Sequence, residues 1–299
     1  MINGGIKMSI LSHKIDFIAL AAVGHANPNG DPLDGNRPRT VYSGLGEMSD
    51  VCIKRKIRNR MQDLGYEIFV KSDDRCDDGY PTLKDRAEQA LGKVDAKAMK
   101  NKDAKDVYVK KACAKWLDVR SFGQIFPFKP EKGSGDKGVS IAVRGPVSIH
   151  QAFSISPVEV ESLQITKSVN ADPGDEKGSN RMGSKHMVAF GLYEIKGAIN
   201  VQLAEKTGFS EEDAEVIKEC LRTLFVNDAS AARPEGSMYV HKLFWWKHAN
   251  KSGQYSSAKV HGSLKIKLKD SNHAPMSPDD YTYMLEELPG LKPEVLDGV

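Results

Sequence analysis

The stretch NPNGDPLDGNRPRT, which begins at residue 27, combines amide and carboxylate side chains that could bind a cation with two arginines that could bind an anion. Its first, third and fifth positions are Asn, Asn and Asp, as in the calcium-binding loop of an EF-hand. The sixth position is Pro32, where that loop requires glycine, and the twelfth is Pro38, where it requires glutamate. The sequence therefore excludes an EF-hand calcium site here.

A transition-metal site and an enzyme active site find little support elsewhere in the chain. His25 lies close in sequence to Asp31 and Asp34, but no second histidine occurs at ligand spacing. The sequence contains no GxSxG, Walker or HExxH motif. We therefore predict no metal, no cofactor and no catalytic residue. A metal-independent ribonuclease that uses histidines stays open, although the candidates lack an evident nucleophile partner: His150, His186, His241 and His261.

The stretch KRKIRNR, which begins at Lys54, contains five basic residues in seven. At about 100° per residue on a helix, Lys54, Arg55 and Arg58 fall on the side turned away from Ile53 and Ile57. Few acidic residues occur at helical spacing, so these charges repel one another unless an anion compensates them. The pattern predicts an exposed basic helix face that binds an anion, and an ordinary solvated face is the alternative.

Arg37 and Arg39 lie shortly before this helix in the chain. Backbone amides at a helix N-terminus attract phosphate, because their N–H groups have no partner within the helix. Loop and helix together therefore suit a sugar–phosphate backbone better than either does alone.

Two further segments carry basic residues. In SLKIKLK, which ends at Lys269, lysines alternate with apolar residues, which predicts a strand whose lysines bind an anion or protect a sheet edge from aggregation. Residues 164–188 are long for a loop and have basic flanks. A hairpin-like protrusion there could wedge an apolar tip between bases, and an ordinary long loop is the alternative. The residues concerned are Lys167, Arg181, Met182, Lys185, His186 and Met187.

The elements that position these residues follow from periodicity and from capping residues. The expected strands are 13–24, 139–158 with a break at Gly145-Pro146, 186–203, 237–248 and 258–269. The expected helices are 49–65, with Ser49 or Asp50 as N-cap and Gly65 as the stop, and 210–225, capped by Ser210. Residues 71–119 read as a lysine-rich, mostly helical insertion, and 118–128 as a short helix or turn. The resulting order, β-α-insertion-β-β-α-β, is the ferredoxin-like or RRM-like pattern.

The composition is ordinary for a globular protein: of 299 residues, 40% are hydrophobic and 28% are charged. The net charge of +3 is too small to indicate nucleic-acid binding by itself. The four cysteines are scattered without a CxxC pair, which disfavours a zinc site or a disulfide framework. The longest apolar run, 17–23, is too short to span a bilayer, and the N-terminal residues lack a signal-like apolar stretch. A cytoplasmic location is expected.

Six motifs together resemble the backbone subunit of type I-C Cascade, a CRISPR-associated protein of the Cas-seven, Csd-type group in the RAMP superfamily. They are NPNGDPLDGNRPR, KRKIRNR, WLDVRSFGQIFPF, VRGPVSI, QITKSVN and RMGSKHMVAFGLYEIKGAINV. They occur in this order over most of the chain, whereas residues 129–138 and the C-terminal tail carry no such motif.

The resemblance implies an α+β fold with a modified ferredoxin-like or RRM-like palm, a helical fingers insertion and a protruding thumb hairpin. The implied domains are a palm at 8–70 and 118–270, fingers at 71–117, a thumb at 164–188 and a C-terminal extension at 271–299. In such a subunit the thumb folds over the RNA and kinks it at regular intervals. The basic helix and the 27–39 loop would then face the RNA backbone.

The implied function is a non-catalytic scaffold that polymerises along the spacer of a CRISPR RNA and presents it for pairing with target DNA. The implied partners are CRISPR RNA, the paired target strand, further copies of the chain, the Cascade subunits at the filament ends and, indirectly, a recruited helicase-nuclease, with no membrane. The implied RNA-binding residues are Asn27, Asn29, Arg37, Arg39, Lys54, Arg55, Arg58, Lys167, Ser168, Asn170, Arg181, Met182, Lys185 and His186.

Two other functions stay open. One is a metal-dependent endoribonuclease of the same superfamily, because related type III subunits resemble target-RNA nucleases with a loop aspartate. Asp31 or Asp34 would then be the residue to test. The other is a general RRM-like RNA-binding protein.

Overall fold

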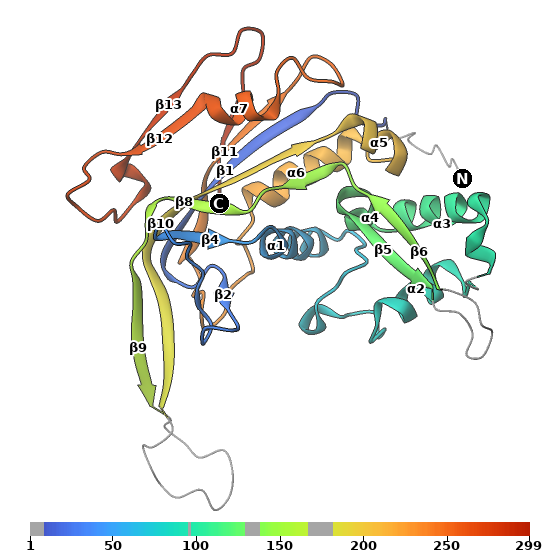
Figure 1. Cartoon of the computed structure of the whole chain (residues 1–299), viewed down its shortest axis with the longest axis horizontal. Helices are drawn as coiled ribbons and strands as arrows, with labels where there is room; N and C mark the ends of the chain where they lie inside the picture. The colour runs from blue at the N-terminus through green and yellow to red at the C-terminus, as the bar shows by residue number, and fades with distance from the viewer. Residues whose placement is uncertain (1–8, 95–96, 129–137, 167–181) are drawn as a thin grey trace, which may run out of the picture.

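The computed structural model describes residues 9–94, 97–128, 138–166 and 182–299, which form an α+β fold (Figure 1). Its centre is an eight-stranded antiparallel sheet in which β1 (Ile15–Ala26) lies between β10 (Met182–Ile199) and β11 (Met238–Lys247). The first nine residues of β1 are all buried, because both faces of the sheet are covered. The central strand predicted at 13–24 is confirmed.

Shorter strands extend the sheet on both sides of this centre. β14 pairs with β11, β8 pairs with β10, β4 pairs with β8, and β7 and β9 pair with other parts of β10. The predicted break at Gly145-Pro146 separates β6 from β7. The bounds are β4 (Leu45–Met48), β6 (Val139–Arg144), β7 (Val147–Ile149), β8 (Ala152–Pro157), β9 (Val160–Thr166) and β14 (Glu294–Asp297). The C-terminal tail thus joins the main sheet through β14.

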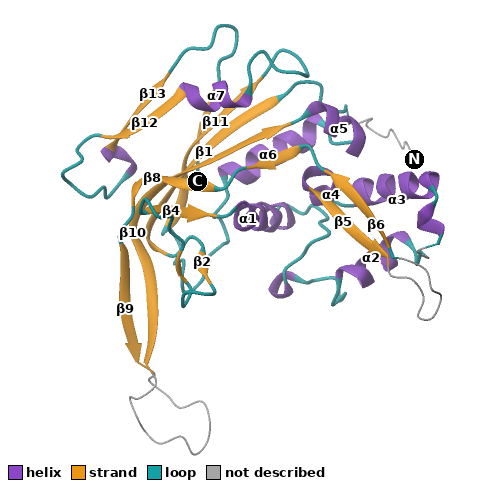
Figure 2. Cartoon of the chain, in the orientation of Figure 1, coloured by secondary structure: helices purple, strands orange, loops and turns teal. Residues whose placement is uncertain are grey.

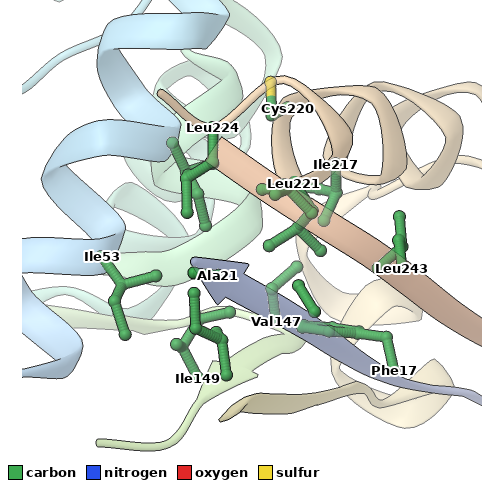
Figure 3. Close-up of a cluster of buried hydrophobic side chains, with 14 of the residues drawn as sticks. Phe17, Ala21, Ile53, Val147, Ile149, Ile217, Cys220, Leu221, Leu224 and Leu243 are labelled. Carbon is green, nitrogen blue, oxygen red and sulfur yellow. The ribbon is translucent and has the colours of Figure 1, made fainter. Parts of the chain in front are cut away.

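Two helices predicted from the sequence cover one face of the sheet, α1 (Asp50–Asp63) and α6 (Glu211–Arg222). Their apolar side chains pack against β1 and β11 in a buried core (Figure 3). Ser49 caps α1 by accepting a backbone N–H hydrogen bond, and Ser210 forms a reciprocal capping box with Asp213 on α6. The helix predictions at 49–65 and 210–225 are confirmed.

The opposite face of the sheet is covered by α7 (Ser257–Ser263) and by the paired strands β12 (Leu264–Leu268) and β13 (Tyr281–Leu285) (Figure 2). These elements bury apolar side chains of β1 and β11, including Phe244 and Trp246. Neither face of the central strands is therefore open to solvent.

The prediction of one strand over 258–269 is wrong in its first half. Residues 257–263 form α7 because Ser256 acts as its N-cap, accepting a hydrogen bond from the N–H of Lys259 at 3.3 Å. The second half is β12, in which Lys265 and Lys267 are exposed between apolar residues that pack on the sheet.

A separate core lies between the helices of the lysine-rich segment and a β-hairpin. It joins α2 (Leu83–Leu91) and α3 (Lys102–Lys115) to α4 (Leu117–Phe122) and to β5 (Gly123–Phe128), which pairs with β6. Residues 118–128 were expected as a short helix or turn, and the expectation fails after Phe122 because the chain turns into β5. Gly123 permits this turn, since its φ is +80° and a Cβ there would lie 2.2 Å from a carbonyl oxygen.

The boundary between palm and fingers stays a prediction. The packing of the strands that follow it bears on where it lies. β5 and β6, which follow the predicted fingers at 71–117, share one core with α2 and α3.

Short elements also belong to the described fold: α5 (Val201–Thr207), η1 (Asp73–Arg75), η2 (Ala98–Lys100) and η3 (Pro278–Asp280). No helix in the described ranges is long and apolar enough to cross a membrane.

β9 and the first part of β10 form a hairpin that projects away from the sheet (Figure 1). Its register runs from Val160 opposite Val188 to Thr166 opposite Met182. This pairing agrees with the hairpin-like protrusion expected at 164–188. The tip of that protrusion lies outside the described residues.

A buried polar cluster joins β1 to α7 and to the chain after β11. Asp16 is fully buried and lies 2.8 Å from His248 Nε2 and 2.9 Å from Lys14 Nζ. Burial alone would raise the pKa of Asp16, but hydrogen bonds from His248 and Lys14 lower it. His261 lies 3.9 Å from the other Asp16 oxygen and 3.1 Å from the Gly197 carbonyl oxygen.

The buried His261 is expected to make stability depend on pH below neutrality. Burial lowers the pKa of His261 below 6.5, although the nearby charge of Asp16 raises it. As the pH falls, this histidine is therefore protonated in the unfolded chain at a higher pH than in the folded protein. The free energy of unfolding should therefore fall as the pH drops below about 6.5, by up to about 1.4 kcal/mol per pH unit. Urea denaturation of wild type and His261→Gln between pH 8 and pH 5 would measure this, and equal slopes for both proteins would contradict it.

Candidate nucleic-acid interface

The two asparagines at the start of the 27–40 loop fix its shape. Asn27 is buried, and its Nδ2 donates a hydrogen bond to the carbonyl of Asn36 at 2.6 Å. Asn29 Oδ1 accepts hydrogen bonds from the backbone N–H and the hydroxyl of Ser49 at 2.9 and 3.0 Å. Because Ser49 is the N-cap of α1, this contact fastens the loop to the start of the helix. Contact of either asparagine with RNA stays a prediction.

Asp31 also serves the loop. It ends β2 (Gly30–Asp31), which pairs with β3 (Arg37–Pro38). Its Oδ1 accepts a hydrogen bond from the N–H of Leu33 at 3.1 Å and lies 3.4 Å from Nη2 of Arg39. Within the described residues, no group of three or more His, Cys, Asp or Glu side chains is placed to hold a metal ion.

Arg37 connects this loop to the projecting hairpin. Its Nη1 donates a hydrogen bond to Ser162 Oγ on β9 at 2.9 Å and lies 3.4 Å from His186 Nδ1 on β10. Ser162 and His186 face each other across the two strands and are themselves 2.9 Å apart. The sequence-based prediction missed Ser162, although the polar residues at 162, 164 and 166 mark that face of the strand.

A small cavity of about 130 Å³ lies between the loop and the root of the hairpin. Its charged lining consists of Arg37 and Arg39 with Asp31, Asp34 and Glu47. Each arginine has one loop aspartate within 4 Å, yet 38% of the Arg37 side chain and 33% of the Arg39 side chain stay exposed. Both guanidinium groups can therefore reach an anion from solvent without leaving the loop.

The predicted basic face of α1 is largely satisfied inside the protein. Lys54 pairs with Asp50 at 2.9 Å, and Arg55 donates a hydrogen bond to the Val70 carbonyl at 2.7 Å. Burial, followed by the nearby charge of Arg58, lowers the pKa of Arg55. The expectation that these charges lack partners is wrong, because most of the partners come from parts of the chain distant in sequence.

Arg58 is the basic residue of this helix face whose charge is most fully paired inside the protein. Its Nε donates a hydrogen bond at 2.9 Å to Asp118, which is fully buried, and its guanidinium stacks over Phe122 at 5.0 Å. Asp118 also accepts the backbone N–H groups of Phe69 and Val70 at 2.7 and 3.1 Å. The side chain of Arg58 is only 13% exposed, so its main role is to join α1 to α4. An RNA contact of this residue stays a prediction.

The hairpin divides the remaining predicted residues between its two faces. His186 shares a face with Ser162 and points toward Arg37, whereas Lys185 pairs with Leu163 on the opposite face. Met182 lies in β10 opposite Thr166. Four predicted residues fall outside the described part of the chain: Lys167, Ser168, Asn170 and Arg181. The structure thus brings Arg37, Arg39 and His186 together and separates them from Lys185.

These features define an α+β protein with a candidate anion-binding surface at the junction of an arginine-bearing loop and a projecting hairpin. Residues 13–286 match the family model described as CRISPR-associated protein Cas7, so the chain belongs to the Cas7 family. The CRISPR-associated protein Cas7 of Haloferax volcanii is 29% identical over 213 residues, which cover 66% of this chain and 60% of that protein. The chain therefore matches less than two thirds of the relative's length.

Two solved structures resemble the fold. A chain of a "CRISPR RNA-guided surveillance complex, pre-nicking" has a TM-score of 0.49 and 17% identity, covering 82% of this chain and 83% of that one. A chain of a "CRISPR RNA-guided surveillance complex" has a TM-score of 0.43 and 19% identity, covering 78% and 68%.

Proposed function

We propose that the protein is a CRISPR RNA-binding scaffold, several copies of which assemble along the guide spacer as the backbone of a type I-C surveillance complex. It grips the sugar–phosphate backbone and leaves the bases available to pair with target DNA, so base pairing supplies the sequence recognition. Its further partners are the subunits at the filament ends and, indirectly, a helicase-nuclease, and it acts in the cytoplasm without a catalytic role.

The observation that carries this proposal is the contact of Arg37 with Ser162 and His186. It holds an exposed guanidinium at the root of the projecting hairpin, beside Arg39. The proposed path of the RNA strand therefore runs between the loop and the hairpin at this junction. The net charge of +3 per subunit is compatible with this role, because repeated copies multiply weak contacts along one RNA.

We further propose that the centre of the sheet is the ferredoxin-like palm of the protein. The strand order β11-β1-β10-β7, with α1 following β1 and α6 following β10, supports this assignment.

Two observations disfavour the alternatives. A general RRM-like protein binds RNA on the exposed face of its sheet through aromatic residues. Here that face of the sheet, including the aromatic side chains of Phe244 and Trp246, is buried under α7 and β12. A metal-dependent nuclease needs a cluster of ligands, whereas Asp31 is engaged by Leu33 and Arg39.

Purified protein incubated with labelled repeat–spacer RNA and magnesium or manganese is expected to bind the RNA and leave it uncut. Because each copy covers a fixed length, the mass of the complex should rise in steps as the spacer is lengthened. Native mass spectrometry and denaturing gels would measure the two results on the same samples.

Metal-dependent cleavage that is lost in Asp31→Ala would favour the nuclease and contradict the scaffold-only role. A constant one-to-one complex on spacers of every length would contradict assembly along the RNA. Loss of cleavage in Asp34→Ala would have the same meaning, because Asp34 is the other candidate aspartate and lines the same cavity. Asp106→Ala, at an exposed carboxylate on α3, is the matched control.

A further inference from the structure

Tyr42 is an aromatic residue held out in solvent beside the arginine-bearing loop. Its relative exposure is 110%, whereas the other exposed aromatic side chains of the described residues, Tyr66, Tyr239 and Phe153, reach at most 40%. Leu33, on the neighbouring turn, is similarly exposed at 97%. Large apolar side chains in full solvent contribute nothing to the core, so the fold gives no reason for an aromatic ring at this position.

The backbone that carries Tyr42 is well fixed. Residues 41–44 form a turn in which the N–H of Gly44 donates to the carbonyl of Val41 at 2.8 Å. Gly44 has φ of +79°, which the turn requires, and its carbonyl accepts the N–H of Val158 at 3.0 Å. The turn is thereby fastened to the segment between β8 and β9, at the root of the hairpin. The backbone at the apex, which carries the tyrosine, is therefore held in place beside the hairpin.

The surroundings of the turn favour an anionic ligand with a flat apolar part. Thr40 and Glu47, which flank the turn, line the same cavity as Arg37 and Arg39. The arginines offer donors to a phosphate, and an exposed phenol ring offers an apolar face close by. A nucleotide has both groups, because every base has a π face on which an aromatic ring can stack.

We propose that the Tyr42 ring stacks on an unpaired base of the RNA whose phosphates Arg37 and Arg39 contact. This assignment rests on the proposed function and adds to it a base contact outside the projecting hairpin. Because stacking reads the face of a base and not its edge, the contact tolerates any sequence. It therefore suits a protein that must bind guides of every sequence.

Binding of Tyr42→Ala, Tyr42→Phe and Tyr42→Leu to single-stranded RNA tests the proposal. The alanine variant should bind about tenfold more weakly, the phenylalanine variant should bind like wild type, and the leucine variant should resemble alanine. Leucine keeps an apolar surface but has no π face. Tyr66→Ala is the matched control and should bind like wild type, because Tyr66 lies beyond the opposite end of α1 from the loop.

RNAs with one abasic nucleotide, moved along the strand one position at a time, then locate the contact. At the stacked position the abasic site should weaken binding of the wild type and cause no further loss in Tyr42→Ala, because both changes remove the same interaction. Additive losses at every position would overturn the proposal, and so would wild-type binding by the alanine variant.

Two further outcomes have separate meanings. If Tyr42→Leu binds as tightly as wild type while alanine does not, the contact needs only an apolar side chain, and the stacking proposal is wrong. If the wild-type protein itself fails to bind RNA, the proposed function fails, whatever the variants do.

Discussion

Replacing Asp118 with alanine is expected to lower the free energy of unfolding by about 3–5 kcal/mol, the usual cost of removing one partner from a buried ion pair. The carboxylate is fully buried and accepts hydrogen bonds from Arg58 and from the backbone of Phe69 and Val70. The variant leaves a mostly buried guanidinium and two backbone N–H groups without their acceptor. Urea or guanidinium denaturation, followed by circular dichroism, would measure the loss.

Asp106→Ala is the matched control, because this carboxylate is exposed on α3 and its replacement should change stability by less than about 0.5 kcal/mol. An equally small effect of Asp118→Ala would contradict the view that this residue joins α1 to α4. The same contacts make charge reversal at Arg58 a poor probe of RNA binding, since a loss of affinity in that variant would also follow from disturbed folding.

The double variant Arg37→Glu/Arg39→Glu is expected to weaken RNA binding roughly 100-fold at fixed, moderate salt. Each arginine supplies one charge-assisted hydrogen bond to phosphate, worth about 1.5 kcal/mol or more, and glutamate adds repulsion. Because the variant no longer neutralises two phosphates of the single-stranded RNA, the slope of log affinity against log salt should become shallower by about 1.4. Titrations by fluorescence anisotropy at four or five salt concentrations would measure both quantities.

A second charge reversal controls for net charge. Lys110→Glu/Lys111→Glu changes the net charge by the same amount, on the exposed side of α3, which lies at the other end of the molecule from the projecting hairpin (Figure 1). It should reduce affinity only slightly, and its salt slope should stay that of the wild type. Equal losses in the two double variants would mean that overall charge, and not the arginine-bearing loop, controls binding.

Local signals predicted the elements that depend on local chemistry. The apolar run of β1, the serine caps of α1 and α6, and the glycine after α1 all lie within a few residues of the structure they specify. The predictions failed for β5, whose pairing partner lies further along the chain, and for the first half of 258–269, where a local capping signal was missed. β5 depends on its pairing with β6, and α7 depends on a serine cap within a lysine-rich pattern that also fits a strand.

The candidate site also contains residues whose setting could be predicted from the nearby sequence and residues whose partners are distant in the chain. Arg37 and Arg39 were predicted as anion-binding residues because they lie in a loop shortly before a helix N-terminus, and the structure leaves both partly exposed. The basic residues of α1 appeared exposed because helical spacing reveals only neighbours within one turn. The partner of Arg58 is 60 residues away in sequence, at Asp118, so no pattern within the helix could disclose it.

The length of β10 has a mechanical consequence. Its 18 residues, about 60 Å of extended chain, run without interruption from the projecting hairpin into the centre of the sheet. The hairpin consequently has no hinge at its root along this strand, and swinging it as a lid would break ladder hydrogen bonds to β1. The hairpin is thus the extension of a strand whose other end lies in the most buried part of the sheet.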